Sequence, residues 1–138
     1  MSALGKIVYT VLSGQSGYAS TLPGGLTPET NPQGNAVPYA TYQGLTRQRI
    51  QNLDGSIAYT IEAIAINVVG ITRAATQAAA DWIATAIKAS PGPQTVGSYY
   101  VSQLRIDDEG DQAESFADGS DDPARATTLN LIGTYKEV

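Results

Sequence analysis

The chain has 138 residues, which predicts a single domain over residues 1–138 with its own hydrophobic core, and it contains neither cysteine nor histidine. Disulfides, thiolate metal sites and any Ser-His-Asp or Cys-His catalytic group are therefore excluded for this chain alone. Eight basic residues against thirteen acidic ones give a net charge of −5, which argues against a broad basic face for nucleic acid. Charged residues make up 15% of the chain, below the roughly 25% of ordinary soluble proteins, so neutral polar groups or partner chains must cover much of the surface.

A helix of about three turns is the first predicted element. Apolar residues recur at helical spacing from Leu4 to Leu12, with Ser2 placed as N-cap and Gly14 as a stop. Several β-branched residues leave a strand as the alternative. The apolar run over residues 7–12 is too short to cross a bilayer, and we expect no membrane partner.

Residues 13–36 are predicted to form a long irregular loop, because glycine and proline recur throughout them. Tyr18, Leu22 and Leu26 are its few apolar residues, and we expect them to attach the loop to the body of the domain. Loops of this length inside a compact domain are usually functional or mobile.

Two strands are predicted next. Residues 36–45 are rich in strand formers, with Pro38 suited to a strand start, and Asp54-Gly55 is typical of a hairpin turn. Residues 57–69 are predicted as a long strand that alternates early and is apolar on both faces later. Both faces of that later part should therefore be covered, one by a helix and the other by something else, such as another subunit.

A helix is predicted over residues 73–89, with Thr72 as N-cap and Pro91-Gly92-Pro93 as the stop. Two further strands are predicted over residues 96–106 and 126–136. The predicted fold is therefore α+β: an antiparallel sheet of about four strands with helices packed on one face, in the order α-loop-β-β-α-β-β.

An acidic segment over residues 107–122 is the clearest charge feature, with eight of the thirteen carboxylates and no basic residue. We predict a hairpin loop with three alternative roles: a solvated loop, a negative surface that repels DNA phosphates, or a cation site. A calcium loop fits poorly, because position six is Gln112 where an EF-hand needs glycine, and position twelve is Asp118. The carboxylates of the segment are Asp107, Asp108, Glu109, Asp111, Glu114, Asp118, Asp121 and Asp122.

No catalytic residue set, metal site or nucleotide-binding loop is predicted, so the chain is expected not to be an enzyme. The alternative of paired carboxylates acting in hydrolysis lacks a buried cleft or a partner with a raised pKa.

A subunit or partner interface is predicted on the strands. Arg47 and Arg49 share a face if they lie on a strand, and they could contact carboxylates of a neighbour, including its acidic segment; a solvated strand end is the alternative. Tyrosine is frequent at interfaces, and most of the eight tyrosines fall on predicted strands. The predicted interface residues are Tyr39, Tyr42, Arg47, Arg49, Ile64 and Ile66.

Several sequence features occur together in one order. Val37-Pro38-Tyr39 follows the long loop, Leu53-Asp54-Gly55 precedes a long strand, and an alanine-rich helix runs from Thr72 to Ala89. Ile106-Asp107-Asp108-Glu109 then enters the acidic segment, and Thr134-Tyr135 lies in the last strand. This arrangement, from Leu4 to Lys136, resembles the tail-completion or tail-terminator proteins of tailed bacteriophages, also called head–tail joining proteins. The chain departs from that pattern in the glycine and proline content of residues 13–36 and in the length of the acidic segment.

The resemblance implies a non-enzymatic virion protein of the neck, at the top of the tail, made in the host cytoplasm. Such proteins form a hexameric ring on the last ring of tail-tube protein, stop tube growth and meet the head-side connector or stopper protein. In contractile phages the ring can also meet the tail sheath. Genome DNA passes through the ring without specific binding, no cofactor takes part, and the acidic segment would line the lumen or dock on a neighbouring subunit.

The sequence is also compatible with three other functions. A head-closure or stopper protein of the same neck is the nearest, and its partner would distinguish it. A small binding module would use residues 13–36 to hold a ligand. A metal-dependent hydrolase would need divalent-ion binding by the acidic segment.

Overall fold

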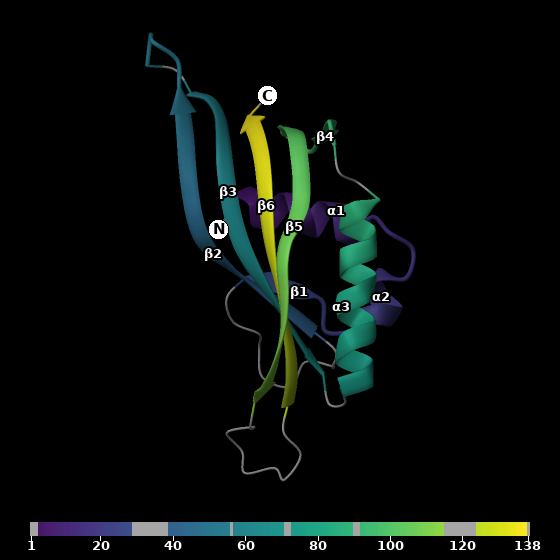
Figure 1. Cartoon of the computed structure of the whole chain (residues 1–138). Helices are drawn as coiled ribbons and strands as arrows, with labels where there is room; N and C mark the ends of the chain where they lie inside the picture. Colours follow the sequence, from purple (N-terminus) through teal and green to yellow (C-terminus); the bar gives the residue numbers. More distant parts are fainter. Residues whose placement is uncertain are drawn as a thin grey trace.

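The computed structural model describes residues 3–28, 39–55, 57–70, 73–89, 92–114 and 124–137. These residues form a mixed α+β fold with one curled six-stranded sheet and three helices on one side of it (Figure 1). The elements in chain order are α1 (Ala3–Ser13), α2 (Tyr18–Thr21), β1 (Leu26–Pro28), β2 (Tyr39–Gln51), β3 (Ile57–Gly70), α3 (Arg73–Lys88), β4 (Gln94–Val96), β5 (Tyr99–Glu114) and β6 (Ala124–Glu137).

The strands follow the order β1-β2-β3-β6-β5-β4 across the sheet. The four long strands β2, β3, β6 and β5 pair with one another antiparallel. At the two edges, β1 pairs with β2 in parallel and β4 pairs with β5 antiparallel. The predicted α+β fold and the antiparallel pairing of the four long strands are confirmed, but the sheet has six strands rather than about four and includes one parallel pair. The two additional strands, β1 and β4, have three residues each, too few to produce a periodic pattern in the sequence.

The predicted hairpin turn at Asp54-Gly55 is confirmed between β2 and β3. The Gly55 N–H donates to the carbonyl of Asn52 at 3.0 Å, and Gly55 has φ 89°, a conformation that favours glycine. Strand β2 continues to Gln51, beyond the predicted end at residue 45, because β3 offers a partner along that whole length.

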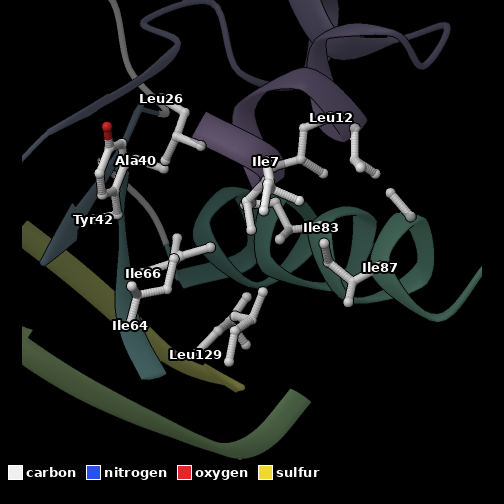
Figure 2. Close-up of a cluster of buried hydrophobic side chains, with 14 of the residues drawn as sticks. Ile7, Leu12, Leu26, Ala40, Tyr42, Ile64, Ile66, Ile83, Ile87 and Leu129 are labelled. Carbon is white, nitrogen blue, oxygen red and sulfur yellow. The ribbon is translucent and has the colours of Figure 1, made fainter. Parts of the chain in front are cut away.

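The hydrophobic core lies between the sheet and the two long helices. Ile7 and Leu12 of α1 and Ile83 and Ile87 of α3 point toward Ile64, Ile66 and Leu129 of the sheet (Figure 2). All of these side chains are buried, and each one contributes roughly 1.5–3 kcal/mol relative to an exposed position. The alternation predicted for the last strand is confirmed, because Leu129, Leu131 and Tyr135 face this core.

Helix α1 approaches the sheet closely at two glycines. A side chain added at Gly5 would overlap the ring of Tyr42 in β2. One added at Gly133 of β6 would meet Leu4 in the first turn of α1. The missing side chains therefore determine how near α1 lies to the sheet.

The segment predicted as a long loop, residues 13–36, contains α2 and β1 and is attached to the body where the structure describes it. Leu22 and Leu26 are buried, and the Leu26 N–H donates to the Tyr18 hydroxyl at 3.0 Å. The Tyr18 ring also lies edge-on to Tyr9, with ring centroids 6.2 Å apart, and contacts Trp82 of α3. The expectation that Tyr18, Leu22 and Leu26 attach this segment is confirmed; residues 29–36 lie outside the described part.

Candidate interaction surface

A buried carboxylate joins three elements at one end of the helix-covered face. Glu62 of β3 is 2% exposed, and its Oε1 accepts a hydrogen bond from the Tyr135 hydroxyl at 2.6 Å and from the Leu4 N–H at 3.3 Å. The Arg47 Nε lies 3.6 Å from the same oxygen. The carboxylate thus sits at the N-terminal end of α1, where the helix dipole favours negative charge.

Burial raises the pKa of the Tyr135 hydroxyl, and its hydrogen bond to Glu62 and the negative charge of Glu62 act in the same direction. The nearby Arg47 opposes this shift in pKa. Tyr135 therefore stays neutral and donates its proton into the hydrogen bond at ordinary pH. Its ring packs edge-on against Tyr99, with centroids 5.5 Å apart. This arrangement stabilises the joint between β2, β3, β6 and α1, and it has the features of a structural site.

A β-bulge in β2 determines which way the arginines point. Gly44 pairs with Ile64 and Thr46 pairs with Ala63, so Leu45 is an extra residue in the strand. Beyond the bulge, Arg47 lies opposite Glu62 and Arg49 lies opposite Thr60. Both arginines therefore share the helix-covered face, beside the N-terminal end of α1.

A cleft of about 460 Å³ opens beside these arginines. Arg47 and Arg49 give the cleft a positive side. The ammonium group of Lys136, which also lines the cleft, lies over the Tyr100 ring on the opposite face of the sheet. The lining residues are Ala3, Arg47, Arg49, Thr60, Tyr99, Tyr135, Lys136 and Glu137.

The opposite face of the sheet is open in the part of the chain that the structure describes (Figure 1). A shallow hollow of about 840 Å³ lies on it, bordered by two exposed tyrosines, Tyr59 and Tyr100. Lys136 lies over the Tyr100 ring, with Nζ 5.8 Å from its centroid. Neutral groups such as Gln103 and Thr134 complete the border, in keeping with the expectation that neutral polar groups cover much of the surface.

The predicted interface residues divide into two groups. Tyr42, Ile64 and Ile66 lie in the core, because α1 packs onto their side of the sheet, and the predicted surface is corrected at these three positions. Tyr39 is half-buried at the start of β2. Arg47 and Arg49 are exposed on the same strand and belong to the cleft.

The acidic segment begins in a strand rather than in a loop. Strand β5 continues to Glu114, so Asp108, Glu109, Asp111 and Glu114 occupy strand positions paired with β6, and Asp107 is the extra residue of a bulge between Ile106 and Asp108. The Asp107 carboxylate is exposed and lies 3.3 Å from Arg105 Nη1. Asp118, Asp121 and Asp122 lie outside the described residues. The sequence missed this extension because strands of such acidic composition are uncommon.

Two long strand edges have no partner strand among the described residues. Strand β1 pairs with β2 only at Ala40, Thr41 and Tyr42, which leaves the outer edge of β2 from residue 43 to residue 51 without a partner strand. Strand β4 pairs with β5 only from Tyr99 to Val101, so the outer edge of β5 from residue 102 to residue 114 also has no partner strand among the described residues.

Within residues 3–28, 39–55, 57–70, 73–89, 92–114 and 124–137, no three acidic side chains form a group that could hold a metal ion. In the same part of the chain, no helix has the length and apolarity needed to cross a membrane.

No protein-family model and no curated protein matches this chain. Among solved structures, a chain of the structure described as "Virion of native gene transfer agent (GTA) particle" is similar, with a TM-score of 0.69. The alignment covers 97% of this chain and 96% of that chain, at 15% sequence identity. At this identity the likeness shows a shared fold, and it extends over nearly the whole length of both chains.

Proposed function

We propose that this protein is a structural component of a phage-like virion, and that it forms a ring which terminates the tail tube and joins the tail to the head-side connector. The observation that carries the virion role is the fold shared, nearly end to end, with a chain of a gene transfer agent particle. The order of sequence elements that resembles tail-terminator proteins supports the finer assignment to the top of the tail.

The surface chemistry suits assembly better than catalysis. The buried carboxylate Glu62 is hydrogen-bonded to Tyr135 and to the backbone of α1, which leaves it in a structural role. The larger hollow is shallow and bordered by tyrosines and neutral polar groups, as is common at protein interfaces. We therefore propose no enzymatic activity.

Genome DNA is proposed to pass through the ring without specific binding. The net charge of −5 disfavours adhesion of phosphate groups to the protein, because like charges repel. Acidic residues of the segment that are not engaged between subunits would add to that repulsion where they face the lumen.

The experiment that tests this function mixes the purified protein with its candidate tail-tube protein. Negative-stain images and light scattering should show rings or caps on tube ends and a halt in tube growth. Tubes that keep growing with bare ends, at saturating concentrations of the protein, would overturn the terminator role.

A second candidate is a different neck component, the head-closure or stopper protein, because the similar solved chain belongs to a complete particle. Binding to the portal-side adaptor in place of the tube would favour this candidate. The same mixing experiment, repeated with the adaptor protein, therefore distinguishes the two.

A further inference from the structure

We propose that neighbouring copies of this chain join edge to edge, with the β5 edge of one copy adding to the β2 edge of the next. The inference deepens the proposed function by naming the contact that builds the ring. It starts from the two outer edges that have no partner strand among the described residues, residues 43–51 of β2 and residues 102–114 of β5. Unpaired N–H and C=O groups along such an edge are a template for another strand.

Strand direction is compatible with this contact. From β2 across β3 and β6 to β5, every pairing is antiparallel, so β5 runs opposite to β2. When two copies stand side by side with their sheets facing the same way, β5 of one and β2 of the other therefore meet as an antiparallel pair. Antiparallel pairing is also the arrangement that the four long strands already use.

The charges of the two edges are complementary. Residues 43–51 of β2 include two arginines, Arg47 and Arg49, and no carboxylate. Residues 102–114 of β5 include five acidic residues and one arginine.

The same charges disfavour the symmetric alternatives. Pairing β2 with β2 would place arginines against arginines, and pairing β5 with β5 would place carboxylates against carboxylates. A contact between unlike edges is heterologous, and repetition of a heterologous contact either closes a ring or extends a filament. The charge pattern thus selects the type of contact that a ring needs.

Charged groups on both edges remain available to a partner. The side chain of Arg47 is 40% exposed although it approaches Glu62, and the side chain of Asp107 is 49% exposed although it approaches Arg105. The ion pair of Asp107 with Arg105 joins two half-exposed side chains, so exchanging it for a contact between subunits has a low cost. Arg47 stays beside the buried Glu62 and offers only its exposed part to a partner.

Disulfide trapping tests the contact directly, since the chain has no cysteine of its own. One variant carries Gln48→Cys on β2 and the other carries Gln103→Cys or Arg105→Cys on β5; all three positions are exposed. When the two variants are mixed under mild oxidation over a rising concentration series, we expect a mixed disulfide dimer. Thr85→Cys, at an exposed position of α3, replaces the β5 cysteine in the matched control.

The outcomes are distinct. Mixed dimers that form at least roughly tenfold faster with a β5 cysteine than with Thr85→Cys support the proposal, because local alignment raises the effective concentration of the thiols. Mixed dimers no faster than the control at any concentration would overturn it, and Arg47 and Arg49 would then be charges that protect the edge from pairing. Faster dimers of Gln48→Cys with itself would overturn it in favour of a symmetric β2 contact.

Charge reversal provides a second measurement. Arg49→Glu is expected to slow mixed-dimer formation several-fold at low salt, and Asp107→Lys in the β5 partner should restore part of the rate. If Asp107→Lys restores none of the lost rate of mixed-dimer formation, the two edges are not held together by complementary charge.

This trapping needs no tube protein, so its result is independent of the proposed function. Normal trapping with tubes that remain uncapped would overturn the terminator role alone. Capped tubes without trapping would overturn the edge contact alone.

Discussion

The two faces of the sheet differ in how the same strands are covered. On one face, Leu129 and Leu131 alternate into a core closed by α1 and α3. On the other face, Ile132 and Thr134 of the same strand are half-buried and no described helix lies over them. The difference teaches that an apolar strand residue alone does not reveal whether a second layer covers it.

Some apolar surface on the open face is buried although no second layer of structure covers that face in the described part of the chain. Ala65 is buried there although the described helices all lie on the other side. It stands between Gln43 of β2 and Asn130 of β6, whose longer side chains flank it. The sequence predicts that something other than a helix, such as another subunit, covers this second face of β3; at Ala65 the neighbouring side chains already provide that cover.

The largest expected effect on stability comes from a substitution that compares the two faces of β6 directly. Leu131→Ala removes a fully buried side chain and should lower the free energy of unfolding by about 2–5 kcal/mol. Ile132→Ala, the next residue on the open face, is the matched control and should cost about 1 kcal/mol. Urea denaturation measures both, and equal costs would mean that the open face is covered after all.

The close approach of α1 should give the next largest effect. Gly5→Ala forces the Tyr42 ring to move and should cost about 1–3 kcal/mol in unfolding free energy. Combining Gly5→Ala with Tyr42→Leu should cost less than the sum of the two single changes, since the smaller side chain makes room. Additive costs in the double-mutant cycle would show that Gly5 and Tyr42 do not meet.

The buried carboxylate gives a pH-dependent prediction. Tyr135→Phe leaves Glu62 without its shortest hydrogen bond and should cost about 1–3 kcal/mol at neutral pH. Folding raises the pKa of Tyr135 above its ordinary value of 10.0. The contribution of Tyr135 to stability is therefore complete below pH 10.0 and is lost as the pH rises above it. Above pH 10, the melting temperature should therefore fall less steeply with rising pH in Tyr135→Phe than in the unmodified chain. If the melting temperatures of the two proteins fall equally steeply above pH 10, the hydrogen bond between Tyr135 and Glu62 is contradicted.

The smallest expected effect lies at the exposed β5 edge. Asp107→Asn removes an ion pair between two half-exposed side chains and should change the unfolding free energy by about 0.5 kcal/mol or less. A loss of 2 kcal/mol or more, on the order of a buried ion pair, would show that this edge is part of the folded core.

The parts of the fold that the sequence predicted are those with long periodic patterns. The helix over residues 73–89 appears as α3, and the long strand over residues 57–69 appears as β3. Helix α1 was likewise predicted from its apolar spacing and ends at Ser13, next to the expected stop at Gly14.

The parts that the sequence missed depend on contacts between distant residues. The three-residue strands β1 and β4 exist only because β2 and β5 offer partners. Glu62 stands at a position that alternation alone assigns to a buried face, yet only the fold brings Leu4 and Tyr135 to it. Tyr42, Ile64 and Ile66 were assigned to an interface because the sequence does not reveal how far α1 reaches.

The extra residue Leu45 has a consequence for how this chain can change in length. If Leu45 were paired regularly with Ala63, Arg47 would lie opposite Ile61 and Arg49 opposite Tyr59, so both arginines would point to the open face and Glu62 would lose its arginine. Natural variants that lack Leu45 should therefore be tolerated, because the ladder becomes regular and Arg47 stays opposite Glu62. Loss of both Leu45 and Thr46 should instead invert the arginines, so deletions of one and of two residues have unequal effects here.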